Sequence, residues 1–267
     1  MKRALILSLA LSAFSITARA QVSVIGSGVE EHAARPGETY SGTLRLRNDG
    51  RQAEEAKVYL TDYTFAADGT TRYAAAGSLP RSSARWIAFT PSQVRIPAGG
   101  EATVGYTVTV PADASLGGTY WSILMIEGIA RGSAESTSGA ANARVRVGIQ
   151  PSTRYGVQIA TTLEGTGAPK VSFTSARAYA AAQGKVLELD LANAGDVAYR
   201  PEIRVELFDA AGGKAGTFTS RRGLLYPGTS LRQTFELGAV PPGSYQALVV
   251  ADAGGDQVFG AQYSLKL

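Results

Sequence analysis

The sequence contains no cysteine and only one histidine, His32, among 267 residues. Without cysteine the chain can form no disulfide bond, so its stability must come from buried apolar side chains. One histidine and no cysteine also exclude ordinary zinc sites, which are built from sets of these residues. A serine–histidine–aspartate triad would have to use His32, which lies in the polar stretch 30–36 and is expected to be a solvated loop residue.

Other signs of catalysis are missing as well. No Gly-x-Ser-x-Gly motif is present, and glycine-rich pieces such as residues 26–28 lack the lysine and helix of a phosphate-binding loop. The acidic pairs Glu30/Glu31 and Glu54/Glu55 match no calcium-loop spacing and are expected to be solvated. We therefore predict a protein that is not an enzyme, with no catalytic residues, no cofactor and no metal.

Long apolar runs are absent except at the N-terminus. Two basic residues precede the apolar stretch 4–16, and residues 18–20, Ala-Arg-Ala, have the small-residue pattern of a cleavage site. We predict a signal peptide over residues 1–20, cleaved after Ala20, and a periplasmic or secreted mature chain that begins at Gln21. No later run is long enough for a transmembrane helix, so neither membrane insertion nor a membrane anchor is expected.

The mature chain also lacks an excess of either charge. The signal peptide carries three of the 26 basic residues and no acidic residue, which leaves 23 basic against 22 acidic residues and a net charge of +1. Basic residues are scattered singly, except for Arg221-Arg222. Such a balanced surface lacks the positive patch that binds polyanions, and nucleic acid is not an expected partner.

What the sequence does contain is a repeat. Residues 44–50 read Leu-Arg-Leu-Arg-Asn-Asp-Gly, and residues 189–195 read Leu-Asp-Leu-Ala-Asn-Ala-Gly. Each half then closes with proline, glycine and tyrosine ahead of an apolar strand. Two copies of one strand-rich unit predict two similar β domains, residues 21–160 and 161–267, each of a size that can bury its own core.

Apolar and polar residues alternate with period two through both halves, and helical periodicity is scarce. Asp68-Gly69, Gly212-Gly213 and Gly254-Gly255 mark hairpin turns, because glycine tolerates positive φ. Tyr120 and Tyr245, each near a strand start, are either tyrosine-corner residues or ordinary half-buried tyrosines. The pattern predicts an all-β fold of two tandem immunoglobulin-like antiparallel β-sandwich domains. The expected strands are 22–29, 39–47, 57–65, 84–89, 102–110, 119–127 and 143–160, then 170–178, 185–193, 202–209, 214–221, 230–237, 244–252 and 257–266.

With catalysis excluded, binding by strands and loops is the function that remains. Val145, Val147 and Ile149 alternate with arginine and glycine, so this strand has one apolar face. The three side chains either line the core of their own domain or face outward at a sheet edge, where a partner's strand can add. The preceding segment, residues 128–143, is small and polar and is either a functional loop or disordered.

The order of these features resembles that of periplasmic pilus-assembly chaperones. The stretch Trp86–Glu101 has a strand, a proline, an apolar-x-apolar-proline turn and the start of a long strand, as in the central segment of that family. Tyr120–Glu127, a polar loop and Arg144–Ile159 follow in the family's order. The resemblance covers most of the mature chain, and it implies two sandwiches that bind a secreted or surface protein subunit of the pilin type.

The resemblance also implies a mechanism. The last strand of the first domain would donate Val145, Val147 and Ile149 to an incomplete subunit fold, while main-chain hydrogen bonds supply affinity. In the family a pair of basic residues in the cleft between the domains binds the subunit's C-terminal carboxylate. Arg154 lies near the position of the strand member of that pair and is the candidate anchor. The first predicted strand carries no basic residue, and Pro151 removes one amide from the donor strand.

A second resemblance implies a different role. The run Val110–Trp121 is similar to a proline, small-residue, glycine and aromatic turn in two-domain bacterial surface proteins that accompany WxL-type wall proteins. That similarity implies a structural or adhesion component of the cell envelope that binds a partner through loops. A third interpretation is an accessory domain that binds carbohydrate on Trp86 or Trp121, although both tryptophans are expected to pack in or near the core.

Overall fold

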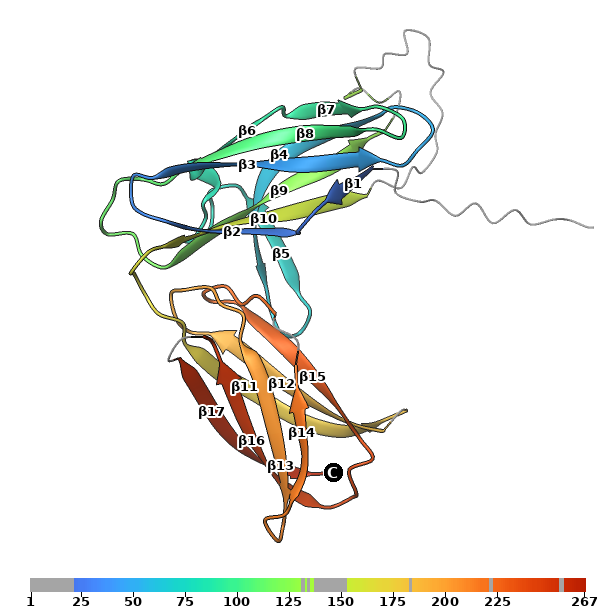
Figure 1. Cartoon of the computed structure of the whole chain (residues 1–267), viewed down its shortest axis with the longest axis vertical. Coiled ribbons are helices and arrows are strands. Elements are labelled where there is room, and N and C mark those ends of the chain that lie inside the picture. The colour runs from blue at the N-terminus through green and yellow to red at the C-terminus, as the bar shows by residue number, and fades with distance from the viewer. Residues whose placement is uncertain are drawn as a thin grey trace, which may run out of the picture.

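The structure is a computed structural model, and it describes residues 22–130, 133, 135–136, 153–182, 184–220, 223–254 and 257–267. Figure 1 shows two β-sandwiches that are joined end to end and meet at an angle. The predicted fold class, two tandem immunoglobulin-like antiparallel β-sandwich domains, is confirmed. Within these residues the one helix is a three-residue 3₁₀ turn, Ala84–Trp86, and no helix is long enough to cross a membrane.

The first sandwich consists, in its described part, of ten strands in two sheets. These are β1 (Val22–Ile25), β2 (Val29–Ala34), β3 (Thr39–Asn48), β4 (Glu54–Phe65), β5 (Thr71–Ala75), β6 (Ile87–Thr90), β7 (Gln93–Ile96), β8 (Glu101–Thr109), β9 (Thr119–Ile129) and β10 (Arg154–Leu163). One sheet has the order β1-β3-β8-β6 and the other the order β2-β10-β9-β4-β5, with β7 also paired to β4. Strands β2 and β10 run parallel, and the neighbouring pair β10 and β9 is antiparallel.

Alternation of side chains places the first core between these sheets. In β3, Leu44 and Leu46 are buried while the arginines between and after them are exposed. Strand β9 departs from this pattern because almost all its residues are buried. One of its faces lies in the first core, and the other contacts the second sandwich. A strand buried on both faces explains the unusually continuous apolar run Tyr120–Ile126.

One expected strand proves to be two. The prediction of a single strand over 22–29 is wrong, because the chain crosses from one sheet to the other at Gly26. Gly26 has a φ of 115°, a conformation that side-chain-bearing residues rarely adopt. The crossing places His32 within β2, where its ring stacks on Tyr40 with 4.2 Å between centroids. The expectation of a solvated loop histidine is therefore also wrong.

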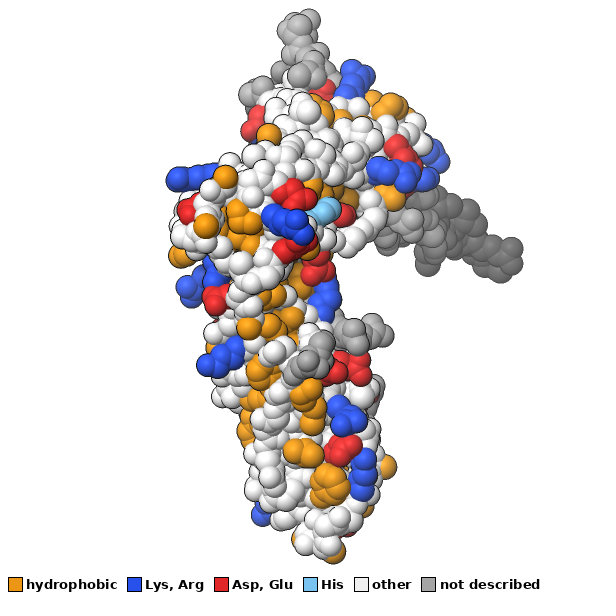
Figure 2. All heavy atoms as spheres, turned by 60° about the vertical axis from the view of Figure 1, so that its left-hand side comes forward, with side chains coloured by type: hydrophobic (Ala, Val, Ile, Leu, Met, Phe, Trp, Pro, Cys, Tyr) orange, Lys and Arg blue, Asp and Glu red, His pale blue; other side chains and the backbone are white. Residues whose placement is uncertain are grey.

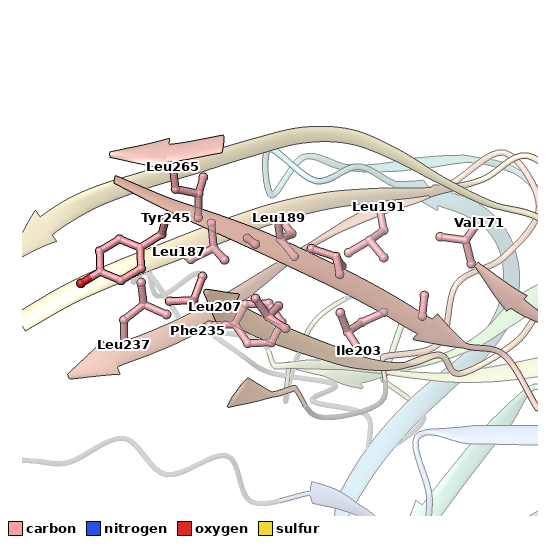
Figure 3. Packing of buried hydrophobic residues seen from close by; sticks show 14 of the residues in the cluster. Val171, Leu187, Leu189, Leu191, Ile203, Leu207, Phe235, Leu237, Tyr245 and Leu265 are labelled. Atoms are coloured by element: carbon pink, nitrogen blue, oxygen red, sulfur yellow. The ribbon is translucent and has the colours of Figure 1, made fainter. Parts of the chain in front are cut away.

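The second sandwich consists, in its described part, of seven strands. These are β11 (Val171–Ala181), β12 (Gly184–Asn193), β13 (Glu202–Asp209), β14 (Lys214–Thr219), β15 (Ser230–Gly238), β16 (Ser244–Asp252) and β17 (Val258–Lys266). Their order is β11-β12-β15 in one sheet and β14-β13-β16-β17 in the other. Figure 3 shows how leucines from β12 meet Ile203 and Leu207 from β13 across the space between the sheets.

The chain passes from the first sandwich to the second between Leu163, where β10 ends, and Val171, where β11 begins. The bounds predicted for the two domains, 21–160 and 161–267, stay a prediction of how the chain divides into folding units. The hairpins predicted from the glycine-containing dipeptides are present: β4 pairs with β5, β13 with β14 and β16 with β17.

The sequence repeat has a structural basis in two buried asparagines. The Asn48 amide donates to the carbonyls of Gln52 and Ile96, and its carbonyl oxygen accepts from the Gly50 amide at 2.8 Å. At the end of β12, Asn193 does the same: its amide donates to two carbonyls, its oxygen accepts from the Gly195 amide at 2.9 Å, and it is 2% exposed. The motif Asn-x-Gly therefore fastens the same turn in both sandwiches.

We expect Asn193→Ala to lower the free energy of unfolding by about 2–3 kcal/mol, because it removes three hydrogen bonds of a buried side chain, to the carbonyls of Val197 and Leu225 and from the Gly195 amide. Urea denaturation of the purified protein measures this change. Asn48→Ala is the matched variant in the first sandwich and should have an effect of similar size. A loss well below 1 kcal/mol in both variants would mean that water replaces the asparagine without penalty, contrary to this account.

The two candidate corner tyrosines differ. Tyr245, at the start of β16, donates its hydroxyl to the Pro241 carbonyl at 2.9 Å, which is the geometry of a tyrosine corner. Tyr120 instead packs on Trp86, with 4.6 Å between ring centroids. Of the two predicted tyrosine corners, the one at Tyr245 is therefore present and the one at Tyr120 is not.

Candidate partner-binding edge

The predicted donor residues Val145, Val147 and Ile149 lie outside the described residues, as does Pro151. The strand that follows them in the chain is β10, which begins at Arg154. The candidate site in the described residues therefore consists of the start of β10 and the surfaces beside it.

Among the strands that the structure describes, none pairs with one edge of the first part of β10. On one side β10 pairs with β9 from Arg154 to Thr162. On the other side β2 pairs with it only from Gln158 onward, and the Gln158 amide donates to the Gly28 carbonyl at 2.9 Å. In the described part of the chain, residues 154–157 thus have a strand neighbour on one side only.

The direction of the backbone groups at this edge follows from three hydrogen bonds. The amides of Gln158 and Glu164 donate toward the β2 side, to Gly28 and Ala34, whereas the Leu163 amide donates to Gly118 ahead of β9. Because successive residues of a strand direct their N–H and C=O groups to opposite sides, even-numbered residues face the β2 side. Arg154 and Gly156 therefore direct their backbone groups at the open edge.

Beside this edge, the outer face of the sheet is apolar. Ile123 and Met125 of β9 are buried there, 5% and 7% exposed. They lean over β10 because Gly156 has no side chain: a Cβ at Gly156 would lie 2.8 Å from Cγ2 of Ile123 and 3.2 Å from Sδ of Met125. Glycine inside a strand often marks such close approach, and this signal was available in the sequence.

A cluster of charges borders the apolar face. The Glu127 carboxylate accepts from Nε of Arg154 at 3.1 Å and from the Tyr59 hydroxyl at 2.9 Å, and Lys57 Nζ lies 4.0 Å away. The Arg154 side chain is 61% exposed, whereas that of Glu127 is 12% exposed. Burial, reinforced by the hydrogen bond to Glu127, raises the pKa of Tyr59. The candidate anchor Arg154 is therefore accessible but already paired with a carboxylate.

Lys57 links this cluster to the segment that follows β9. Its Nζ donates to the Glu135 carboxylate at 2.9 Å, and this hydrogen bond raises the pKa of Lys57. The Gln93 amide donates to the Glu135 carbonyl, and the Ser136 hydroxyl donates to the Glu55 carboxylate at 2.8 Å. Part of the predicted loop 128–143 is thus attached to β4 and β7 of the first sandwich.

The second sandwich attaches to the same outer face through Tyr226. Its ring stacks on Trp121 with 4.5 Å between centroids and an interplanar angle of 11°, and its hydroxyl donates to Oε1 of Gln158 at 2.8 Å. Tyr226 is fully buried, which raises the pKa of its hydroxyl. Trp121, expected in or near the core, is buried between the sandwiches, and Trp86 is half-buried.

Polar contacts complete this junction. The Arg81 guanidinium pairs with the Asp196 carboxylate, and the Thr119 amide donates to the Asp196 carbonyl at 2.8 Å. At the edge strand β2, Arg200 pairs with Glu31 at 2.7 Å. Together with the aromatic stack, these polar contacts join the second sandwich to the first.

Sequence reasoning had not identified Tyr226, Gly156 or Glu127 as site residues. Tyr226 was visible only as part of a Tyr-Pro-Gly turn, and its contacts with Trp121 and Gln158 are too distant in sequence to be inferred. Among the described residues, no three histidine, aspartate or glutamate side chains gather in a way that could hold a metal ion. A strand edge that is open beside an apolar face can pair with an extended chain.

Comparison with known proteins identifies similar folds only. No family model matches the sequence, and no curated protein matches it. The Class 5 fimbriae chaperone CfaA is 11% identical, with a TM-score of 0.48 and 90% of this chain and 98% of that chain covered. The YadV chaperone is 13% identical, with a TM-score of 0.44, and the match covers 92% of this chain and 100% of that chain. The Pseudomonas aeruginosa CupB2 chaperone is 14% identical, with a TM-score of 0.40, and the match covers 92% of this chain and 100% of that chain.

Proposed function

We propose that this protein is a non-enzymatic periplasmic module that binds an exported protein subunit by β-strand addition, as a pilus-assembly chaperone does. The observation that carries the proposal is the open edge of β10, where Arg154 and Gly156 direct their backbone groups away from β9. An unpaired strand edge is a template for a partner's strand. The proposed binding strand comprises Val145, Val147 and Ile149, which precede this edge directly in the chain.

Affinity and selectivity would have separate sources in this arrangement. Main-chain hydrogen bonds along the open edge favour any extended segment, whereas the alternating apolar side chains of Val145, Val147 and Ile149 select a partner with matching pockets. The buried side chains of Ile123 and Met125 hold the outer face of the sheet rigid beside the edge. A rigid template lowers the ordering cost of strand addition to that of the incoming segment alone.

The first experiment is capture of the partner by cross-linking in the periplasm, followed by purification. We expect the wild-type protein to recover a small β-rich exported subunit and Val147→Arg to recover little of it, because a charged side chain would enter an apolar pocket. Thr103→Arg is the matched control, since Thr103 is exposed on β8 away from the edge. Equal recovery by the wild type, Val147→Arg and Thr103→Arg would refute strand donation.

Hydrogen exchange on the captured complex tests the edge directly. We expect new protection at the amides of Arg154 and Gly156, which face the open edge, and little change at Tyr155 and Val157, whose amides face β9. This alternating pattern requires a strand at the edge. Uniform protection, or none, would place the partner elsewhere even if Val147→Arg fails to fold.

A further prediction concerns Arg154 as the anchor of a partner's terminal carboxylate. Because Glu127 competes for the guanidinium, we expect Glu127→Gln to raise partner capture and Arg154→Ala to lower it, each by about 3–10-fold. The chain offers a close control: Arg177 pairs with Glu188 in the second sandwich at nearly the same side-chain exposures, 64% and 13%. Arg177→Ala should leave capture unchanged; if Arg154→Ala does so too, Arg154 has only a structural role.

The alternative is a structural or adhesion component of the cell envelope that binds through loops. The contacts of Glu135 and Ser136 with β4 and β7 favour it, because they give part of the 128–143 segment a fixed place on the first sandwich. Under this alternative, removing the contact by Glu135→Ala would reduce partner capture while Val147→Arg would not. The two variants therefore separate the two functions.

A further inference from the structure

The four outer edges of the second sandwich are not equally protected against strand addition. Proteins block such edges with charges, bulges, prolines or short strands. The β11 edge has a register shift between Phe173 and Ser175 and an exposed Arg177. The β15 edge carries Arg232 and Glu236. The β14 edge is six residues long, starts at Lys214 and has a register shift beside it.

The β17 edge has none of these devices through most of its length. This strand has nine residues, and its register with β16 is continuous from Val258 to Lys266. It contains no proline, and its one charged residue is Lys266 at its end. In Figure 1 it forms the outer border of the lower sandwich. Among the described edges of this sandwich, β17 is therefore the one least protected by charge, bulge, proline or short length.

Hydrogen bonds at both ends of β17 show which backbone groups are free. Gly243 and Leu267 exchange both of their N–H···O=C bonds, and the Ala253 amide donates to the Gln257 carbonyl at 2.9 Å. Odd-numbered residues therefore bond to β16, and even-numbered residues face outward. Four consecutive outward positions present both N–H and C=O groups at the edge: Val258, Gly260, Gln262 and Ser264.

Exposed apolar side chains lie next to the same edge. Of the four large hydrophobic side chains that are exposed in the described residues, Leu248 (41%) and Val258 (60%) are on β16 and β17. They are on the outer face of the sheet, where Leu248 pairs with Gln262 and Val258 with Asp252. Figure 2 brings this side forward and shows hydrophobic side chains running down the lower sandwich.

We propose that β17 pairs antiparallel with β17 of a second copy of this chain, so that two four-stranded sheets join into one across a two-fold axis. The charge pattern favours this occupant. Residues 258–265 carry no charge, so a two-fold antiparallel pairing places no like charges opposite one another. Lys266, at one end of the strand, is carried away from Lys266 of the other copy by the same antiparallel arrangement.

This inference does not depend on the proposed function. The β17 edge belongs to the second sandwich, whereas the open edge of β10 belongs to the first. A dimer formed through β17 therefore leaves the β10 edge available to a partner. Failure of one proposal says nothing against the other.

The test is sedimentation velocity of the purified full-length mature protein over a range of concentrations. We expect a concentration-dependent dimer, and we expect Gln262→Lys to raise its dissociation constant at least about tenfold, because the two-fold axis brings both new charges to the edge. Thr217→Lys, on the exposed β14 edge of the same sheet, adds the same charge and should leave the dimer unchanged. A wild-type protein that is monomeric throughout, or a dimer insensitive to Gln262→Lys, would overturn the proposal.

The absence of cysteine allows a second, geometric test. Each of Gly260→Cys, Gln262→Cys and Ser264→Cys introduces the only thiol of the chain. Mild oxidation should cross-link at least one of these variants into a disulfide dimer far more than it does Thr217→Cys, because only thiols at the shared edge meet across the axis. Cross-linking no greater than that of Thr217→Cys in all three variants would contradict the β17 pairing.

Discussion

Tyr226→Ala is expected to lower the free energy of unfolding by about 3–5 kcal/mol, the range for removing a large buried aromatic side chain. Tyr226 is fully buried and stacks on Trp121. It also contacts Tyr63 and Phe65 edge-on, with 6.2 Å between ring centroids in both pairs. Denaturation monitored by tryptophan fluorescence measures the change.

Tyr226→Phe is the matched variant. It keeps the ring and the stack on Trp121 but loses the hydrogen bond to Gln158, so the expected loss is about 1 kcal/mol. A loss of similar size in Tyr226→Ala and Tyr226→Phe would mean that the hydrogen bond, rather than the packing, holds the junction. Near-wild-type stability of Tyr226→Ala would contradict the central place given to this residue.

The same variant tests how the junction serves binding. Gln158, the hydrogen-bond partner of Tyr226, is also the first β10 residue that β2 covers. Loosening the junction should therefore change the orientation of the second sandwich beside the open edge without removing any residue of that edge. We expect Tyr226→Ala to give a larger radius of gyration and a broader pair-distance distribution in small-angle X-ray scattering. We also expect it to reduce partner capture. A folded variant with unaltered scattering and capture would show that the angle between the sandwiches is set elsewhere.

The fold could be read from the sequence because its determinants are local. Leu44 and Leu46 alternate with arginine, as Leu189 and Leu191 do with polar or small residues, and this alternation alone defines which face is buried. The Asn-x-Gly turn recurs because one side chain satisfies two backbone groups within four residues of itself, while its third partner, the Leu225 carbonyl for Asn193, lies farther along the chain. The sheet crossing at Gly26 could not be predicted from the residue pattern, because the change of sheet is visible only in the strand pairing and in the positive φ of Gly26.

The site was less accessible to prediction because its contacts join distant segments. The pairing of Arg154 with Glu127 follows from the β9–β10 register, and that register depends on the whole first sandwich. Tyr226 meets Trp121 only because the second sandwich docks on the outer face of β9. Sequence alone indicated a strand with one apolar face, Val145, Val147 and Ile149, which lies either in the core or at a sheet edge, and one basic candidate, Arg154. It contained no information about which carboxylate would pair with that candidate.

Asp62→Ala is expected to lower the free energy of unfolding by about 3–4 kcal/mol, because it removes a buried carboxylate that accepts four hydrogen bonds. The Asp62 carboxylate is 1% exposed. It accepts from the amides of Ser78 and Leu79 at 2.9 and 3.0 Å, and from the hydroxyls of Ser82 and Ser122 at 2.6 and 3.0 Å. The two hydroxyls lie 3.1 Å apart and can turn to each other, and the Ser78 amide also donates to the Ala75 carbonyl at 3.1 Å. The Leu79 amide has a fixed direction and loses the acceptor that Asp62 provides.

The consequence should extend to the junction between the sandwiches. The segment that Asp62 fastens continues to Arg81, whose guanidinium donates to the Gly117 carbonyl and pairs with Asp196 of the second sandwich. We therefore expect hydrogen exchange in Asp62→Ala to rise first at Ser78 and Leu79 and then at Thr119, whose amide donates to the Asp196 carbonyl. Asp68→Ala removes an exposed aspartate that caps the neighbouring hairpin turn, so its exchange should change only near Thr70. If Asp62→Ala exchanges like Asp68→Ala, water replaces the carboxylate, and the connection from Asp62 to the junction does not hold.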